Sequence, residues 1–209
     1  MSTRRYDSSR RKEAAAQTKH QVLEAGRHLF LERGYAATTM SDVAARARVS
    51  AATANAAFGG KAGLLKRLID VSIVGDEEDV PVSERAIARE VAAETDPRRQ
   101  CQMLAAFVAG VHQRLAPLME VMHQAAGADD QVRAQASKGQ EGRRQGMAEF
   151  VALISPEALR PGLDADRAAD IVWALTEHRL FVGLVHERGW SIEEYTAWLG
   201  DQIATALLG

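Results

Sequence analysis

The sequence predicts an all-α protein with a small N-terminal domain and a larger C-terminal domain. Apolar residues recur at spacings of three and four along most of the chain, and no stretch shows the strict alternation of a half-buried strand. Hydrophobic residues make up 46% of the chain but aromatic residues only 5%, which indicates cores of Ala, Leu and Val on helices. Glycines and prolines separate the periodic segments, as expected for a series of helices.

The chain begins with a segment that lacks periodicity. Residues 1–13 are polar and rich in Arg and Ser, so we expect a basic flexible arm. From about residue 14 to residue 33 the apolar residues fall at helical spacing, and Gly34 follows as a C-terminal stop. This segment is predicted to be the first helix of a domain that extends over 14–67.

Two short helices and a tight turn follow. Thr39 and Asp42 have the spacing of a capping box, which predicts a second helix starting at residue 40. Ser50 is a suitable N-cap for a third helix, and Gly59-Gly60 ends it. A fourth helix is predicted from Lys61.

The acidic segment 75–81 contains Gly and Pro and is predicted to be a loop at or near the boundary with the second domain, residues 68–209. Pro117 is expected to kink or break the helix in which it lies. The later helices are predicted at 82–94, 97–115, 117–126, 130–154, 164–188 and 191–208.

The last two predicted helices point to self-association. The segment 164–188 is apolar nearly all round, so it must be either central in the fold or part of an interface. The helix after it repeats apolar residues at helical spacing. Two such helices could pack against their symmetry mates as a four-helix bundle, which predicts a homodimer.

The charges are segregated along the chain. Residues 1–67 contain 13 Lys and Arg against 5 Asp and Glu, whereas the remainder contains 13 against 23. A basic end on an acidic body suits the binding of a polyphosphate such as DNA, although a basic tail without function has the same composition. The single cysteine, Cys101, excludes an intramolecular disulfide. Because no signal peptide and no apolar run of spanning length are visible, we expect a cytoplasmic protein outside the membrane.

The stretch from Thr18 to Leu68 carries the most specific motif. A short helix, a tight turn and a second short helix with a Ser cap form the geometry that presents a helix to the DNA major groove. The stretch also resembles the TetR family of transcriptional regulators over about fifty residues, in the expected order. The matching residues are Leu29, Phe30, Gly34, Tyr35, Thr38, Thr39, Val43, Ala44, Val49, Ser50, Thr53, Phe58, Lys61, Leu64 and Leu65.

The resemblance implies an N-terminal helix-turn-helix domain and a C-terminal helical ligand-binding and dimerisation domain. It implies a sequence-specific regulator, usually a repressor, that a small-molecule effector releases from a double-stranded DNA operator. Helix 50–58 would be the recognition helix, and Thr39 and Lys61 would contact phosphates on either side of it. Thr39 could instead be only a helix cap, and Lys61 only a solvated surface lysine.

The recognition helix departs from the family pattern. After Thr53 the family usually has Leu and Tyr, whereas this chain has Ala54-Asn55-Ala56-Ala57, so few groups remain for hydrogen bonds to bases. Affinity could then come from phosphates, from groove shape and from the basic arm. The alternative is a dimeric helical ligand- or partner-binding protein whose N-terminal domain over 14–67, the head, no longer binds DNA specifically. The candidate DNA-binding residues are Thr39, Arg46, Arg48, Ser50, Ala51, Ala52, Thr53, Asn55, Ala56 and Lys61.

A ligand pocket is expected in the C-terminal domain, because the family binds its effector between the middle helices and the first dimer helix. Each candidate could also be ordinary core packing. Glu177 and His178, next to Arg179, could form a buried polar network or an interface pair. The candidate pocket residues are Phe107, Val111, Leu115, Met119, Met122, His123, Phe150, Trp173, His178 and Phe181.

The sequence gives no indication of catalysis. No nucleophile motif, phosphate-binding glycine loop or metal-ligand spacing is present, so we expect neither an enzyme nor a cofactor. His112 and His123 lie eleven residues apart and would share one helix face, but Pro117 between them argues against a metal site.

Overall fold

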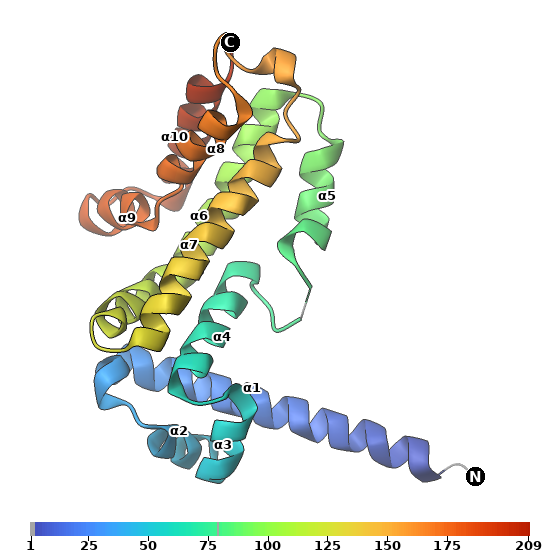
Figure 1. Ribbon diagram of the computed structural model, residues 1–209, viewed down its shortest axis with the longest axis vertical. Helices are drawn as coiled ribbons and strands as arrows, with labels where there is room; N and C mark the ends of the chain where they lie inside the picture. Colours follow the sequence, from blue (N-terminus) through green and yellow to red (C-terminus); the bar gives the residue numbers. More distant parts are fainter. Residues whose placement is uncertain (1–2, 79) are drawn as a thin grey trace. The chain divides into compact units, whose positions relative to one another are not determined.

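The computed structural model describes residues 3–78 and 80–209, with side chains from residue 10 onward. The described chain is helical, as predicted, and its one β-bridge joins Leu159 to Leu208 (Figure 1). None of the helices in this part of the chain is both long enough and apolar enough to cross a membrane. The α-helices are α1 Thr3–Ala37, α2 Met40–Ala47, α3 Ala51–Phe58, α4 Lys61–Val74, α5 Ala86–Ala93, α6 Pro97–Ala126, α7 Asp130–Val151, α8 Ala165–Leu175, α9 His178–Phe181 and α10 Ile192–Leu207.

The chain forms two compact units, and each unit consists of two segments that are separated in the sequence. The first unit contains residues up to 71 together with 117–136, and the second contains 72–116 and 137–209. The predicted boundary at residue 67 lies close to this division. The corner between α6 and α7, however, packs with the N-terminal helices. Chain order alone cannot reveal this, because the corner is more than 50 residues away in sequence.

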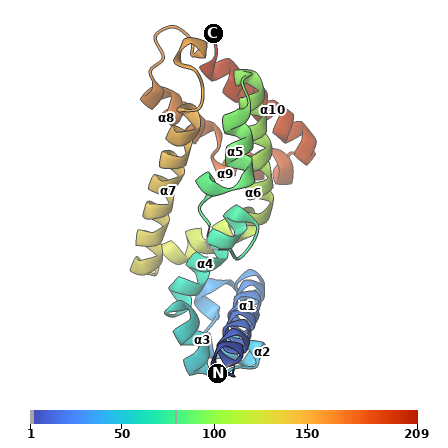
Figure 2. The ribbon, with the colours of Figure 1, turned by 90° about the vertical axis from the view of Figure 1, so that its right-hand side faces the viewer.

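The core of the first unit lies between α1, α2, α3 and α4 (Figure 2). Ala54 is the one residue of α3 that is fully buried, and α2 packs through Val43, Ala44 and Ala47. Apolar side chains of α1 and α4 complete this core: Val22, Leu23, Leu29, Phe30, Leu64, Leu65 and Leu68.

The core of the second unit is formed by α6, α7, α8 and α10. Helix α10 packs against α8 through a face that includes Tyr195, Leu199 and Ile203, all of which are fully buried. Gly200 lets α10 approach α6, because a Cβ atom there would lie 3.3 Å from the Cα atom of Gln102. The second unit also contains a 3₁₀ turn over Val82–Glu84 before α5, where a single helix over 82–94 was predicted.

Helix α1 begins at Thr3, so the segment predicted as a flexible arm is helical from that residue. Arg, Lys and Glu, which have good helix propensity, make up six of the thirteen residues of this segment, so a helix can form here without an apolar face. Residues 1 and 2, the side chains of residues 3–9 and Asp79 of the acidic loop lie outside the described residues. Gly34 interrupts the helix at φ 77°, in agreement with the predicted stop.

The prediction that Pro117 separates two helices is wrong, because α6 continues through it from Pro97 to Ala126. A proline in a helix leaves the carbonyl four residues earlier without its usual donor. Pro117 and Gln113 are both exposed, so water can satisfy the Gln113 carbonyl. The helix therefore tolerates the proline at this position.

The single helix predicted over 164–188 is also wrong. Helix α8 ends at Leu175, the short helix α9 follows, and a π-helix covers Val182–Glu187. Arg143 of α7 causes the break, because its Nη1 donates to the carbonyl of Trp173 (2.5 Å) and to Oγ1 of Thr176 (3.1 Å). The Thr176 hydroxyl in turn donates to the Val172 carbonyl at 2.8 Å. Side chains thus occupy the Trp173 carbonyl, which a continuous helix would offer to the Glu177 amide, and this amide donates to the Ala174 carbonyl at 3.2 Å instead.

Candidate nucleic-acid interface and ligand site

Helices α2 and α3 form the predicted helix-turn-helix. Arg48 caps α2 in the left-handed conformation at φ 56°, which is uncommon for a residue with a side chain. Ser50 then caps α3, and its Oγ accepts from the Thr53 amide at 3.0 Å. Gly59 ends α3 at φ 70°. The caps at Thr39, Ser50 and Gly59 confirm the predicted helix boundaries.

One face of α3 is exposed and contains the predicted base-reading residues. Ala54 points inward, whereas Ser50, Ala51, Ala52, Thr53, Asn55 and Ala56 are all exposed. Most of this surface consists of methyl groups, since four of its six exposed positions are alanine or threonine. Such a surface fits closely into a groove but offers few hydrogen bonds.

The polar groups of α3 are engaged with one another. The hydroxyls of Ser50 and Thr53 lie 2.8 Å apart, and Nδ2 of Asn55 donates to the Ala51 carbonyl at 2.9 Å. One of the two hydrogens on Nδ2 is therefore used within α3, which leaves the other hydrogen and Oδ1 of Asn55 for a base.

Thr39 is fully engaged in its capping box. Its Oγ1 donates to Oδ2 of Asp42 at 2.6 Å, and its amide donates to the same oxygen at 2.9 Å. The hydrogen bond from the Thr39 hydroxyl is the main cause that lowers the pKa of Asp42, and the hydrogen bond from the Thr39 amide is the second cause. Because both donors of Thr39 are used and a carboxylate adjoins them, a phosphate must displace Asp42 to bind there. Arg46 and Arg48 are exposed and adjoin α3, so they are the nearest mobile positive charges.

Lys61 has specific partners within the protein and is not a simple solvated lysine. Its Nζ donates to the Tyr35 carbonyl at 3.0 Å and lies 4.1 Å from the centroid of the Tyr35 ring. Tyr35 in turn donates from its hydroxyl to Oδ2 of Asp129 at 2.7 Å. The sequence analysis identified Lys61 but assigned no role to Asp129, which is 94 residues from Tyr35.

The ten predicted pocket residues do not form one group. Met119, Met122 and His123 belong to the first unit, and the other seven belong to the second. Phe150 and Phe181 lie in the core of the second unit, while His123 is exposed. Of the residues in the second unit, Phe150 and Phe181 belong to one core cluster, and Phe107 packs against this cluster.

Polar residues within the second unit gather next to Phe181. Its ring contacts His112 edge-on at 5.6 Å and Tyr195 at 5.1 Å between centroids. The Tyr195 hydroxyl lies 3.3 Å from Nδ1 of His112, which is 5% exposed. Burial is the main cause that lowers the pKa of His112 to about 4. The second cause is the electrostatic interaction with His178. His112 is therefore neutral at physiological pH.

Glu177 and His178 take part in a network within the chain. His178 Nδ1 lies 2.5 Å from Oε1 of Glu177, and Arg143 donates from Nη2 to Oε2 at 2.9 Å. The hydrogen bond from His178 is the main cause that lowers the pKa of Glu177. The guanidinium of Arg143 also lies 4.6 Å from the centroid of the Trp173 ring. Arg143, which the sequence analysis missed, thus joins α7 to the break between α8 and α9.

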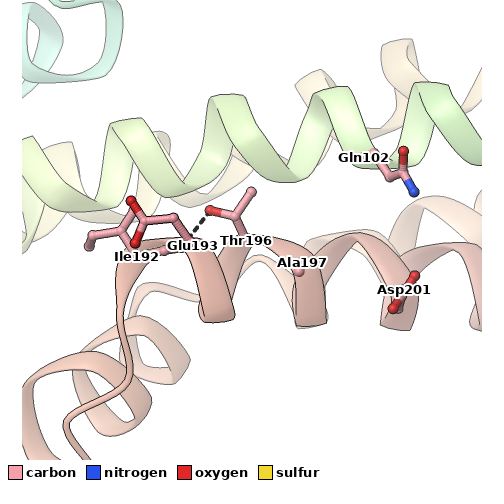
Figure 3. Close-up of a pocket in the computed structure, with 6 residues that line it drawn as sticks. All are labelled: Gln102, Ile192, Glu193, Thr196, Ala197 and Asp201. Atoms are coloured by element: carbon pink, nitrogen blue, oxygen red, sulfur yellow. Dashed lines mark hydrogen bonds between the residues drawn. The ribbon is translucent and has the colours of Figure 1, made fainter.

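A shallow hollow on the second unit lies between α6 and α10 and has a volume of about 510 Å³. Figure 3 shows its lining, with the Thr196 hydroxyl turned back to the Ile192 carbonyl at 2.7 Å. None of the predicted pocket residues lines it. Its lining residues are Gln102, Ile192, Glu193, Thr196, Ala197 and Asp201.

The two histidines weighed as a metal pair lie on the same helix, α6, where His112 is buried and His123 is exposed. In the described part of the chain, no three His, Cys, Asp or Glu side chains lie close enough to hold a metal ion.

Comparison with known proteins agrees with this architecture. Residues 22–68 match the family model of bacterial regulatory proteins of the tetR family. No curated protein matches the chain in sequence. Among solved structures, the chain is similar to NalD, the secondary repressor of the MexAB-OprM multidrug efflux pump in Pseudomonas aeruginosa, with a TM-score of 0.71 and 19% identity over 94% of this chain and 98% of NalD.

Two further solved structures have the same fold and contain ligands. SmeT in its complex with triclosan gives a TM-score of 0.68 at 18% identity, with 92% of each chain covered. A transcriptional regulator from Saccharomonospora viridis in complex with choline gives 0.67 at 18% identity, with 93% of this chain and 99% of that chain covered. At these identities the likeness establishes the fold. The family match assigns residues 22–68 to the helix-turn-helix domain of bacterial regulatory proteins of the tetR family.

Proposed function

We propose that the protein is a homodimeric repressor that a small-molecule effector releases from its DNA operator. The exposed face of α3 on a basic head carries the proposal, because a capped helix that follows a tight turn can enter the major groove. The positive charge of residues 1–67 would supply the phosphate contacts and the salt dependence of binding. Such a regulator works where chromosomal DNA is, in the cytoplasm.

The chemistry of α3 favours operators that are rich in A·T pairs at the contacted positions. The methyl groups of Ala51, Ala52 and Ala56 suit the C5-methyl of thymine, and Asn55 can pair with adenine through its amide. Few other base contacts are available. We therefore expect phosphates and groove shape to supply a large share of the affinity.

The effector would bind in the second unit, next to the break between α8 and α9. The indole Nε1 of Trp173 is buried and has no hydrogen-bond acceptor among the described residues. A buried donor without an acceptor costs free energy, which an acceptor on a ligand would recover. The effector must bind one arrangement of the two heads better than the other to cause release.

Dimerisation would use the helices from residue 165 to the C-terminus. Apolar side chains there stay partly exposed in the single chain, including Ile171, Leu175, Leu184, Val185 and Trp198. A second copy would cover them, as in a four-helix bundle.

Selection of random duplex DNA by the purified protein over a series of salt concentrations tests the proposal. Enrichment of a palindromic site is expected for a dimeric sequence-specific regulator. Salt-sensitive binding without an enriched site would contradict base readout by α3. Failure to bind DNA at low salt would favour the alternative, a dimeric protein that binds a ligand or a partner.

Replacing Asn55 with alanine is expected to change base preference at a single operator position, by about 1–3 kcal/mol for a bidentate contact. Replacing Lys61 with alanine should weaken binding to all sequences by a similar factor, since Lys61 would contact phosphates and no bases. Titrations against the selected site and its single-base variants measure both effects. Lys66→Ala is the control, because Lys66 is exposed on the same helix and pairs with Asp70. Identical profiles for the Asn55 and Lys61 variants would contradict these roles.

A further inference from the structure

The corner between α6 and α7 is tied to the head by one side chain. Asp129 lies in this corner, directly before α7, within the same compact unit as the helix-turn-helix. Its Oδ1 accepts from the amides of Gln131 (2.9 Å) and Val132 (3.2 Å), and its Oδ2 accepts from the Tyr35 hydroxyl at 2.7 Å. One carboxylate therefore caps α7 with one oxygen and holds the head with the other.

Tyr35 carries this contact to the start of α4. The side chain is 6% exposed and packs against Phe30 at 5.6 Å between ring centroids. Lys61, the first residue of α4, binds both its carbonyl and its ring face. Only Gly59 and Gly60 separate Lys61 from the end of α3. The chain of contacts thus runs from Asp129 through Tyr35 to the residues that fix α3.

The Tyr35–Asp129 hydrogen bond has the properties of a strong one. Burial, and then the hydrogen bond and the charge of Asp129, raise the pKa of Tyr35, so the phenol remains a donor. The Tyr35 hydrogen bond is the main cause that lowers the pKa of Asp129, so the acceptor is ionised. Hydrogen bonds from neutral donors to carboxylates are shorter and stronger than those between neutral groups.

We propose that Asp129 is a positioning residue for DNA binding, which acts from outside the helix-turn-helix by holding Tyr35 and, through it, Lys61 at the start of α4. This inference rests on the proposed function. In a dimer, a head held in one orientation fixes the distance between the two recognition helices, and hence the spacing of half-sites that the protein accepts. Loss of the contact frees the head, so binding weakens and spacing discrimination falls.

The test compares Tyr35→Phe, Asp129→Asn and the double variant. Asparagine is also a good N-cap, so Asp129→Asn keeps the cap of α7 and removes the charged acceptor for Tyr35. Asp130→Asn is the matched control, because it removes the same charge one residue further on, at an exposed position that pairs with Arg133. Affinity is measured for the selected operator and for operators whose half-sites are one base pair closer or further apart.

Each single variant is expected to bind the selected operator roughly tenfold more weakly than wild type, as the loss of one charge-assisted hydrogen bond predicts. The double variant should lose little more than either single variant, and the preference for the selected spacing should shrink by a similar factor. Asp130→Asn should resemble wild type. Additive losses, tighter binding, or an equal loss at every spacing would overturn the proposal, since a general loss of stability does not change spacing preference.

Hydrogen exchange without DNA separates this proposal from the proposed function. If Asp129 positions the head, the Leu64 amide, which donates to the Gly60 carbonyl at 3.0 Å, should exchange faster in Tyr35→Phe and Asp129→Asn than in Asp130→Asn. Unchanged exchange overturns the positioning role even if the protein binds an operator. Faster exchange in a protein that selects no DNA site would instead contradict the proposed function. It would still support the role of the Tyr35–Asp129 hydrogen bond in positioning the head.

Discussion

Replacing Gly63 with alanine is expected to destabilise the head by about 3 kcal/mol, the upper end of the usual cost of overpacking, and to abolish DNA binding. A Cβ atom at Gly63 would lie 1.9 Å from the carbonyl oxygen of Phe58, well inside van der Waals contact. Phe58 is the last residue of α3, so relief requires movement of backbone and not of a flexible side chain. The recognition helix must shift or α4 must unwind. Thermal unfolding by circular dichroism and DNA titration measure the two effects.

Glycines in α7 provide controls for this variant. Gly139 and Gly142 lie within α7, and a Cβ atom at either position would have no atom within 4 Å. Alanine there should stabilise the protein by about 0.5–1 kcal/mol, because glycine is the poorer helix former. The same substitution thus has opposite expected signs at Gly63 and in α7. A Gly63 variant as stable as Gly139→Ala would show that α3 and α4 are not packed as closely as described.

The fold was predictable where short-range chemistry determines it. The caps at Thr39, Ser50 and Gly59 use residues within three or four positions of one another, and the structure confirms each one. Prediction failed where water or a residue distant in sequence determines whether a helix continues. Helix α6 continues through Pro117 at an exposed position, and α8 stops where Arg143, 30 residues from Trp173, binds the Trp173 carbonyl.

The candidate site shows the same division. The exposed positions of α3 follow from helical periodicity, so the sequence indicated Ser50, Thr53 and Asn55 correctly as surface residues. It could not show that their polar groups bond to one another and to the Ala51 carbonyl, because that depends on rotamers. The contact between Tyr35 and Asp129 was beyond any local pattern, since it requires the α6–α7 corner to pack with the head.

The second large effect concerns acid stability and depends on His112. Its imidazole is 5% exposed, lies next to Phe181 and faces the Tyr195 hydroxyl. The pKa of His112 is about 4 in the folded protein, against 6.5 in its ordinary state, mainly because burial disfavours the charged ring. Between pH 6.5 and pH 4 the unfolded chain therefore binds a proton at this residue that the folded chain does not bind.

Stability must fall as the pH is lowered through this window, because the unfolded state binds more protons. A shift from 6.5 to about 4 corresponds to a loss of about 3 kcal/mol in the free energy of unfolding by pH 4. Above pH 6.5 both states carry neutral His112, and this contribution is complete. The His112→Asn variant keeps an acceptor for Tyr195 without a titratable ring, so it should lose that part of the pH dependence. Urea unfolding at a series of pH values measures the difference.

His123→Asn is the matched control, because His123 lies on the same helix but is exposed. It should follow the wild-type curve from pH 7 to pH 4. Glu177, whose pKa is lowered chiefly by the hydrogen bond from His178 and least by the charge of His112, is present in all three proteins, so the main part of its own loss of stability in acid is common to them. If His112→Asn and wild type lose stability in parallel over this range, burial does not keep His112 neutral. The core next to Phe181 would then be open to water, which would favour a solvated pocket over close packing at this position.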